Sequence, residues 1–382
     1  MTAWLLPVQA GLVRPDLAIE VISPPYDLLS GQERAAYSAR VPRSFLNGTP
    51  SSESADPEED AALRRESASR YMSARLAESA WRSMPAGFFI YRIRSDGHTQ
   101  TGVVGDVPAN AFPEVVRPHE DTRPTRVADL VDYLNRVGFG SSPVGLTYRR
   151  VPEIDEVVQK LTDEEPDLDA VLEDGDHHTV WSVTDAESKS SLARALAAIE
   201  ASYIIDGHHR VAATLARGHD PATPGGRFLA VAFPDNDLAI YPFHRWLATD
   251  WRPDRVPDGV GLTPEQGAVV AVTREGEWFF DLGGTGDLGV IGDDTSALAQ
   301  TVLGPFLGVS DERVDHRVVF VPGYPDQEAL RSQVASNGGV GFLLHPPTIE
   351  SIMRVSDAGG VMPPKATFFA PKPRSGVFLV RR

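Results

Sequence analysis

The sequence predicts a mixed α/β, or α+β, fold. The chain has 382 residues, which is enough for about two to three domains with sizeable cores. Short apolar runs typical of strands are spread along it, and helical patterns lie between them. In the middle of the chain a strand, a helix, a second strand, a glycine turn and another helix follow one another, which is the order of a small α/β unit.

Residues 1–150 are expected to form an N-terminal mixed α/β region. An acidic loop over residues 51–60 leads into its first long helix. Two of its strands form a hairpin around Ser95-Asp96-Gly97. The expected elements are helices over about Pro57 to Arg82 and Ala128 to Val137, and strands over Phe88–Ile93, Thr101–Gly105 and Val144–Tyr148.

Residues 151–250 are expected to form the central unit, and residues 251–382 a C-terminal α/β region. A surface loop is predicted at 163–167. The central elements are strands over 178–183, 203–205, 228–233 and 238–241 and helices over 186–199 and 211–216. The last forty residues alternate strand and turn and end on a strand over 376–380. Gly283-Gly284-Thr285-Gly286 predicts a flexible turn, because the Gly-Lys-Ser/Thr of a phosphate-binding loop does not follow it.

Composition narrows the class of protein. Hydrophobic residues make up 42% and charged residues 23%, as in ordinary globular proteins. The formal charge of −17 argues against affinity for nucleic acid or anionic membranes. The absence of cysteine excludes thiolate chemistry and disulfides. No apolar run is long enough for a membrane helix, and the start lacks the pattern of a signal peptide. We therefore expect a cytoplasmic protein.

The most informative motif is Asp206-Gly207-His208-His209-Arg210, which follows the apolar run Tyr203-Ile204-Ile205 and precedes a helix. A strand, a glycine turn and a helix N-terminus form a site for an anion, because the first amides of the helix and its dipole point there. The two histidines and Arg210 add donors, and Arg210 can hold a phosphate through two hydrogen bonds.

Asp206 does not fit a plain phosphate site, because its charge repels a phosphate. A carboxylate at this position indicates a bound metal ion, a proton acceptor or a partner that orients a histidine. The alternative for the motif as a whole is structural, with histidines that cap backbone groups and an arginine paired with a surface carboxylate.

Arg117-Pro118-His119-Glu120-Asp121-Thr122 is the second cluster. It combines a histidine and a glutamate able to act as bases with an acid and a hydroxyl, and it lacks the second histidine of a zinc-protease motif. Its structural alternative is a helix N-cap formed by Asp121 or Thr122.

Three further segments are candidates. In the run from Met362 to Lys372, Lys365 or Lys372 can meet a phosphate as a point charge, or cover apolar surface with its stem. Ser23-Pro24-Pro25-Tyr26-Asp27 is either a rigid loop facing the substrate or a simple turn. Tyr241-Pro242-Phe243-His244-Arg245 is either the edge of a pocket or a structural strand end.

These segments, in this order, resemble a widespread bacterial and archaeal family of unknown function. That family carries PPYD near the N-terminus, HE-x-T in the middle, DGHHR after a strand and MPPK-[SA]-T-F/Y-F near the C-terminus. The corresponding residues here are Pro24–Asp27, His119–Thr122, Asp206–Arg210 and Met362–Phe369, and Pro242–Arg245 matches a P-x-HR segment. The sequence departs from the pattern at Val211-Ala212, where an aromatic residue and a glutamate are common.

The central unit, about Val180 to Gly218, further resembles the ParB/sulfiredoxin-like superfamily. Its members place a glycine turn and a helix N-terminus on nucleotide phosphates. Among them are ATP- or ADP-dependent kinases of free serine with a similar turn. The resemblance implies that Gly207, His208, His209 and Arg210 bind phosphates and that Asp206 binds Mg²⁺ or orients the acceptor. A base upstream of the motif is also implied, with Glu120 as the first candidate and Glu187 as the second.

The function predicted from the sequence is a nucleotide-dependent phosphotransferase acting on serine or a similar hydroxyl compound. Asp206, Glu120 and His209 are its expected catalytic residues, and Lys365 is expected to neutralise phosphate charge. The expected substrate-binding residues are Tyr26, Asp27, His119, Thr122, His244 and Arg245. ATP, ADP or CTP is the expected nucleotide, Mg²⁺ the expected metal, and a homodimer is possible.

Two other functions stay open at this point. One is a ParB-like nucleotide-binding switch or scaffold without kinase activity. The other is a metal-dependent phosphatase, in which Asp206, the two histidines and a metal ion activate water.

Overall fold

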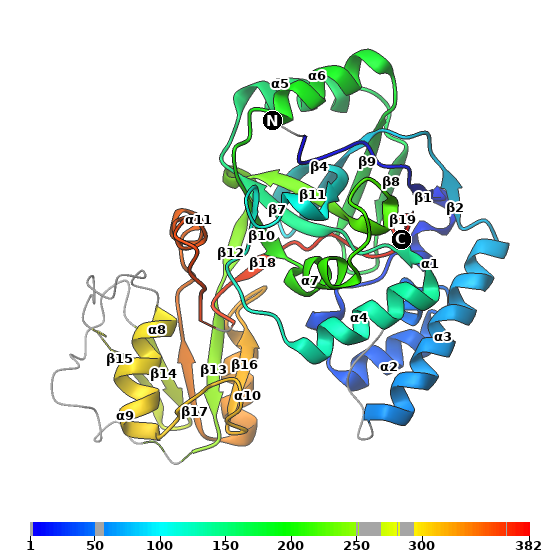
Figure 1. Cartoon of the computed structure of the whole chain (residues 1–382). Coiled ribbons are helices and arrows are strands. Elements are labelled where there is room, and N and C mark those ends of the chain that lie inside the picture. The colour runs from blue at the N-terminus through cyan, green and yellow to red at the C-terminus, as the bar shows by residue number, and fades with distance from the viewer. Residues whose placement is uncertain are drawn as a thin grey trace. The chain divides into compact units, whose positions relative to one another are not determined.

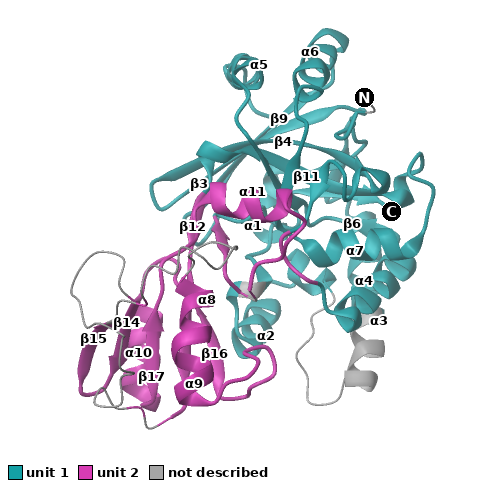
Figure 2. Cartoon of the chain, turned by 60° about the vertical axis from the view of Figure 1, so that its left-hand side comes forward, with its two compact units in different colours: residues 1–118, 122–238, 371–382 teal, residues 119–121, 239–370 magenta. Residues whose placement is uncertain are grey.

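A computed structural model describes residues 3–49, 57–249, 251, 269–280, 282, 294–363 and 365–382, with the backbone alone at Asp27, Phe280 and residues 57–65. Most of the acidic loop predicted at 51–60 and all of the glycine turn at 283–286 lie outside the described residues. The chain forms two units, which Figure 2 colours separately. Unit 1 comprises residues 1–118, 122–238 and 371–382, and unit 2 comprises residues 119–121 and 239–370.

Unit 1 is built on an eight-stranded mixed sheet, in which both parallel and antiparallel pairs occur. Its strands, in sheet order, are β5 (Val116–Arg117), β10 (Ser202–Asp206), β7 (Val144–Tyr148), β11 (Arg227–Pro234), β4 (His98–Pro108), β3 (Phe88–Ser95), β9 (His177–Val183) and β8 (Leu168–Val171). β7 and β10 are largely buried along their length, as their continuous apolar runs predict. β3 and β4 form the predicted hairpin.

A four-stranded sheet completes the strands of unit 1. It joins the beginning of the chain to residues 378–381, in the order β2 (Trp81–Ser83), β1 (Gly11–Val13), β19 (Phe378–Arg381) and β6 (Phe139–Gly140). Phe378 is fully buried and its ring lies 5.3 Å from that of Phe89. Residues 371–382 are therefore an integral part of unit 1.

The helices of unit 1 pack in two groups (Figure 1). α5 packs against α6 and against strands β3 and β9, whereas α7 packs against α4 and against β7 and β11. The α-helices are α1 (Ala18–Val21), α2 (Gly31–Arg40), α3 (Pro57–Ala77), α4 (Pro124–Val137), α5 (Pro152–Thr162), α6 (Ala186–Leu196) and α7 (His208–Arg217). The short 3₁₀ helices are η1 (Pro15–Leu17), η2 (Tyr26–Leu28), η3 (Phe45–Gly48), η4 (Ala109–Ala111), η5 (Pro224–Gly226) and η6 (Asp235–Asp237).

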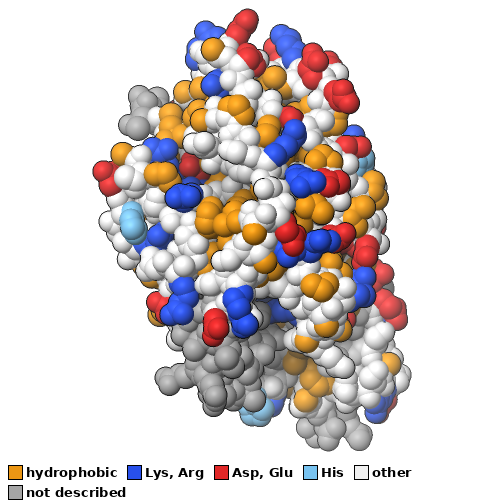
Figure 3. Space-filling model, turned by 90° about the vertical axis from the view of Figure 1, so that its right-hand side faces the viewer, with side chains coloured by type: hydrophobic (Ala, Val, Ile, Leu, Met, Phe, Trp, Pro, Cys, Tyr) orange, Lys and Arg blue, Asp and Glu red, His pale blue; other side chains and the backbone are white. Residues whose placement is uncertain are grey.

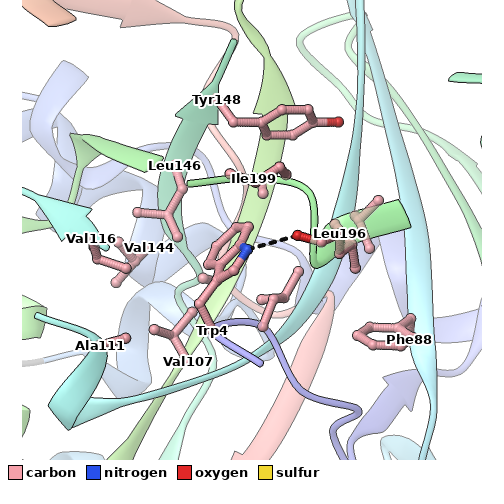
Figure 4. Close-up of a cluster of buried hydrophobic side chains, with 14 of the residues drawn as sticks. Trp4, Phe88, Val107, Ala111, Val116, Val144, Leu146, Tyr148, Leu196 and Ile199 are labelled. Atoms are coloured by element: carbon pink, nitrogen blue, oxygen red, sulfur yellow. Dashed lines mark hydrogen bonds between the residues drawn. The ribbon is translucent and has the colours of Figure 1, made fainter. Parts of the chain in front are cut away.

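The core of unit 1 is a cluster of buried side chains around Trp4, drawn in Figure 4. The indole Nε1 of Trp4 donates a hydrogen bond to the carbonyl of Leu196 at 3.1 Å, so its one polar group is satisfied inside the core. Val144 and Leu146 of β7 are part of the same cluster. The cluster thus ties the N-terminal segment to the end of α6 and to the central strands.

Unit 2 is built on a five-stranded sheet in the order β15 (Gly276–Phe280), β14 (Val269–Thr273), β17 (Val340–Leu343), β13 (Phe243–Leu247) and β16 (Val318–Pro322). A two-stranded ribbon pairs β12 (Ala239–Tyr241) with β18 (Phe368–Ala370), antiparallel. Its helices are α8 (Asp294–Leu298), the π-helical turn η8 (Ala299–Leu303), α9 (Gly304–Leu307), α10 (Glu328–Asn337) and α11 (Ile349–Asp357).

The mixed fold class and the central order β9, α6, β10, glycine turn, α7 confirm the sequence prediction. Two predictions were wrong, and some helices were not predicted. The first long helix ends at Ala77 instead of Arg82, since Ala80 N–H closes it on the carbonyl of Arg75 and Trp81 enters β2. α5 was not predicted, and α11 lies where only strands and turns were expected.

The two units also differ from the three consecutive regions expected from the sequence. Residues 151–238 share a sheet with the N-terminal region, and residues 371–382 join them from the other end of the chain. The division into regions 1–150, 151–250 and 251–382 stays a prediction.

Among the residues that the structure describes, no helix is both long and apolar enough to cross a membrane. On the face drawn in Figure 3, basic and acidic side chains are interspersed with hydrophobic ones. That face therefore offers no extended basic surface, consistent with the net charge of −17.

Candidate functional site

The Asp206–Arg210 motif forms the junction between β10 and α7 in unit 1 (Figure 1). Tyr203 and Ile204 are fully buried and fix the strand, which ends at Asp206. Gly207 has φ = 100°, a left-handed conformation, and α7 begins at the next residue. A Cβ at this position would lie 2.7 Å from the Nε of Arg210, so a larger residue would displace the guanidinium from this place.

The first turn of α7 is suited to an anion. Gly207 has no side chain to cap the helix, and the first turn contains no acidic residue. The helix dipole is therefore not compensated by a carboxylate within this turn. Arg217 in the last turn complements the opposite end of the dipole.

Asp206 lies between two cationic side chains. Its Oδ1 accepts a hydrogen bond from Nζ of Lys372 at 3.1 Å, and its Oδ2 pairs with NH2 of Arg210. Burial raises the pKa of the Asp206 carboxyl, but the charges of Lys372 and Arg210 outweigh it and hold the pKa well below its ordinary value. Asp206 is therefore an ionised carboxylate that bridges two cations.

Arg210 is fixed from two directions. Its NH1 donates to the carbonyl of Pro143 at 2.7 Å, and its NH2 pairs with Asp206, so the guanidinium folds back over the glycine turn. Its side chain keeps 22% of its surface exposed. A planar guanidinium held in this way is oriented before any ligand arrives.

The two histidines of the motif have different surroundings. His208 is buried at the start of α7. The Nε2 of His209 accepts a hydrogen bond from the backbone N–H of Arg123 at 3.0 Å. In the neutral ring the proton then resides on Nδ1, which is a donor.

A cavity of about 150 Å³ lies in unit 1. His209 and Arg210 of the motif and Tyr26 of the PPYD segment are among its lining residues. Its other lining residues come chiefly from α4, α7 and the strands: Leu130, Tyr133, Leu134, Ala213, Thr214, Val144, Phe228 and Val380. Mostly apolar walls with a few convergent polar groups are typical of a small-molecule site.

In unit 2, His119 of the second predicted cluster meets the segment from Met362 to Phe369. The carbonyl of His119 accepts from the N–H of Met362 at 2.7 Å, its Nε2 lies 3.4 Å from the hydroxyl of Thr367, and its ring lies 6.4 Å from that of Phe369. The HEDT segment is divided, because residues 119–121 belong to unit 2 and Thr122 to unit 1.

Lys365 and Arg245 meet in the same unit. The ammonium of Lys365 lies 4.7 Å from the ring centre of Phe243, and NH1 of Arg245 donates to the Lys365 carbonyl at 3.2 Å. Lys365 has φ = 52°, an unusual backbone conformation for a lysine. Arg245 is fully buried and its Nε pairs with Glu312 at 2.5 Å.

His244 is also fully buried. Its Nδ1 accepts from the N–H of Leu344 at 3.2 Å, and burial lowers its pKa to about 4. His244 and Arg245 both make structural contacts at the strand β13, which argues against the predicted role of either in binding a substrate. That role stays a prediction.

The predicted magnesium site can be examined at Asp206. Mg²⁺ takes oxygen ligands in near-octahedral geometry. Both oxygens of Asp206 are engaged by cationic groups, and the part of the chain that the structure describes contains no cluster of three or more His, Asp or Glu side chains able to hold a metal. In this arrangement the residues fit an ion-pair role for Asp206 and do not fit a protein-built magnesium site.

The structure thus brings Tyr26, His209 and Arg210 to one cavity and adds Lys372 to the turn. It places His119 and Lys365 in unit 2 and describes only the backbone of Asp27. Glu187, the second candidate base, is exposed in the first turn of α6. The lining of the cavity was not predicted, because its residues come from distant segments without a shared motif.

A family profile described as "Protein of unknown function (DUF1015)" matches residues 5–258, about two thirds of the chain. The chain belongs to the DUF1015 family. The match covers the motifs at Pro24–Asp27, His119–Thr122, Asp206–Arg210 and Pro242–Arg245. The MPPK segment and Lys372 of this DUF1015 protein follow the matched region.

No curated protein matches the sequence of this chain. Among solved structures, a free serine kinase in complex with AMP is 15% identical, covers 70% of this chain and 87% of its own, and has a TM-score of 0.40. SbnI with a C-terminal truncation, from Staphylococcus aureus, is 14% identical over 70% and 84% of the two chains, with a TM-score of 0.40. A conserved hypothetical protein from Pyrococcus furiosus is 13% identical over 71% and 93%, with a TM-score of 0.36.

Proposed function

We propose that the protein is a nucleotide-dependent phosphotransferase that acts on a small hydroxyl compound such as serine, with the nucleotide phosphates bound at the Gly207–Arg210 turn. The observation that carries the proposal is the geometry of this turn. A left-handed glycine, an uncapped helix start and a fixed guanidinium lie together in a turn whose His209 and Arg210 line a cavity.

Phosphate binding follows from the charges at the turn. The protein carries a net charge of −17, so an anion needs a local positive site. Arg210 and Lys372 supply two cationic side chains, and the positive end of the α7 dipole adds to them. His209 contributes a further donor through Nδ1.

The cavity supports a small organic group beside the phosphates. Its volume of about 150 Å³ is below the usual range for a complete drug-sized ligand, so it suits one ring or one short side chain. Tyr26 and Tyr133 offer aromatic surface there, and Arg34 and Arg126 add positive charge to the lining. Either the nucleoside or the acceptor can occupy it.

Phosphoryl transfer depends mainly on positioning and on neutralisation of charge. In the proposed reaction Arg210 and His209 position the phosphates, and a carboxylate accepts the proton of the attacking hydroxyl. Glu120 is the proposed proton acceptor and Lys365 a further neutralising charge, and both belong to unit 2.

The experiment combines binding with turnover. The protein is incubated with ATP or ADP, Mg²⁺ and a panel of amino acids and small alcohols, and nucleotide consumption and phosphorylated product are measured. Arg210→Met is expected to lower nucleotide affinity about 10- to 100-fold, because a charge-assisted contact is worth about 1.5–3 kcal/mol. Arg70→Met, which removes an exposed arginine of α3, is the matched control.

The outcomes separate three functions. Phosphorylated product that depends on Arg210 supports the phosphotransferase. Tight nucleotide binding without product from any acceptor points to a nucleotide-binding switch, and release of phosphate from phosphoserine without nucleotide points to a hydrolase. If neither ATP nor ADP binds, the proposal fails.

A further inference from the structure

Lys372 is a candidate for a role at the Gly207–Arg210 turn. The family profile does not cover this lysine, because the match ends at residue 258. Its ammonium is 3.1 Å from Oδ1 of Asp206, and its side chain is only 11% exposed. It follows unit 2 in the chain and reaches the motif because residues 371–382 return to unit 1. No other lysine is paired with the motif among the described ion pairs.

The backbone on both sides of Lys372 is fixed. The carbonyl of Pro371 accepts from Nε2 of Gln100 at 2.8 Å, in a buried contact. Two residues further on, Arg374 is 4% exposed, and its NH2 pairs with Asp174 at 2.8 Å and also with Asp176. Lys372 is therefore held at the turn by the fold of unit 1 and does not depend on Asp206 alone for its position.

The two cations approach Asp206 from different sides, one on each carboxylate oxygen. A carboxylate that bridges an arginine and a lysine occupies the same cationic groups that a phosphate would use. The same group also adds a negative charge to a site that is otherwise built for an anion. Asp206 thus satisfies Lys372 and Arg210 but competes with any phosphate for them.

We propose that Lys372 is a phosphate-binding residue of the Gly207–Arg210 turn and that Asp206 is an internal anion, which holds Lys372 and Arg210 until a nucleotide phosphate replaces it. This inference rests on the proposed nucleotide site. A terminal phosphate can compete with Asp206 for the two cations, because it carries more negative charge and more acceptor oxygens than a carboxylate.

Binding of ADP without divalent metal tests the proposal, since chelation removes any contribution from a metal ligand. Calorimetry is used on the full chain with ADP as the probe and EDTA in the buffer. Lys372→Met is expected to weaken ADP binding about tenfold, the loss of one charge-assisted contact. Asp206→Asn is expected to tighten ADP binding, because the competing anion is removed. Lys160→Met, an exposed lysine of α5, is expected to bind like the unmodified protein.

The double variant Asp206→Asn with Lys372→Met keeps the test valid if Lys372→Met alone unfolds. It leaves no unpaired aspartate, and we expect it to bind ADP about tenfold more weakly than Asp206→Asn. Circular dichroism establishes that each variant is folded.

Two results would overturn the inference. The first is that Lys372→Met leaves ADP affinity unchanged both in the unmodified protein and in Asp206→Asn. The second is that Asp206→Asn binds ADP more weakly than the unmodified protein. If the unmodified protein binds no ADP, the proposed function itself fails, which is distinguishable from either result.

Discussion

Gly207 and Arg210 depend on each other. The guanidinium of Arg210 occupies the space that a side chain at position 207 would fill, and the left-handed backbone of Gly207 lets α7 begin directly after β10. The glycine therefore has two functions, one in the backbone and one in making room for the arginine. This explains why the turn combines these two residue types.

Gly207→Ala tests this dependence. The variant is expected to destabilise the protein by about 1–3 kcal/mol and to weaken ADP binding, because the new methyl group adds a collision with Arg210 to the unfavourable φ. Gly218→Ala is the matched control, since Gly218 at the other end of α7 has φ = 63° but no atom within 4 Å of the new Cβ. It should cost about 1 kcal/mol and leave ADP affinity unchanged, as measured by denaturant unfolding and calorimetry.

His244 makes the stability of the protein depend on pH. Its pKa is lowered to about 4 by burial, whereas an exposed histidine in the unfolded chain titrates near 6.5. The unfolded state therefore binds more protons at this residue between these values, so the contribution of His244 to stability is complete above about pH 6.5 and is lost as the pH drops toward 4.

We expect His244 to account for up to about 3 kcal/mol of that loss. Urea unfolding of unmodified protein and of His244→Asn at pH 7 and pH 5 measures it. A pH dependence that is the same in both proteins would contradict this assignment.

At the scale of the elements, β19 and the segment before it are fastened to the residues that line the cavity. Ser141, buried in the loop before β7, donates to the carbonyl of Phe378 and accepts from the N–H of Gly376 at 2.7 Å. It therefore fastens the segment that carries Lys372 and also lines the cavity. One hydroxyl connects the C-terminal strand to the binding region.

Ser141→Ala leaves the N–H of Gly376 without this partner in a buried place. The expected cost is about 1–3 kcal/mol of unfolding free energy. Ser73→Ala, which removes an exposed hydroxyl bonded to the carbonyl of Ser69 in α3, should change stability by less than about 0.5 kcal/mol. Equal unfolding midpoints for the two variants would show that the Ser141 contacts are not stabilising.

Elements with a clear local signal were predictable. β3 and β4 follow from apolar runs on either side of an Asp-Gly turn, and β10 from a strand that stops at a charged residue. α5 also carries a signal, with Pro152 in its first turn and apolar residues Ile154, Val157, Val158 and Leu161 at helical spacing.

The candidate site was predictable only in its local part. The Asp206–Arg210 turn is continuous in sequence, so its strand, glycine and helix start can be inferred from neighbouring residues. Lys372 is 166 residues away from Asp206, and the choice between Lys365 and Lys372 depends on where the chain returns to unit 1. Long-range pairing of this kind leaves no periodic trace in a single sequence.

Apart from residues 119–121, unit 2 is a single insertion into the sequence of unit 1. Unit 2 leaves unit 1 after Leu238 and returns at Pro371, and β12 and β18 pair at these ends, with Ala239 opposite Ala370. Opposed residues of an antiparallel pair lie about 5 Å apart. The gap that unit 2 spans in unit 1 is therefore short enough for a tight turn.

A shortened chain tests whether unit 1 binds nucleotide by itself. In this shortened chain the dipeptide Asn-Gly, which is favoured in two-residue hairpins, replaces residues 240–369 and links Ala239 to Ala370. We expect this chain to fold and to bind ADP, but to lose phosphoryl transfer because the environment of Glu120 is removed. A chain that stops at Leu238 lacks β19 and Lys372 and should not fold cooperatively, as measured by circular dichroism on heating. Equal behaviour of the two chains would contradict the assignment of residues 371–382 to unit 1.

The return of residues 371–382 also has a consequence during protein synthesis. A ribosome makes Asp206 and Arg210 long before it makes Lys372, Arg374 and β19. Until then the growing chain has the glycine turn but lacks the strand and the ammonium that complete it. The nascent protein therefore acquires its full charge arrangement at the turn only after unit 2 has been translated, so an incomplete chain cannot hold a nucleotide in the way proposed for the finished one.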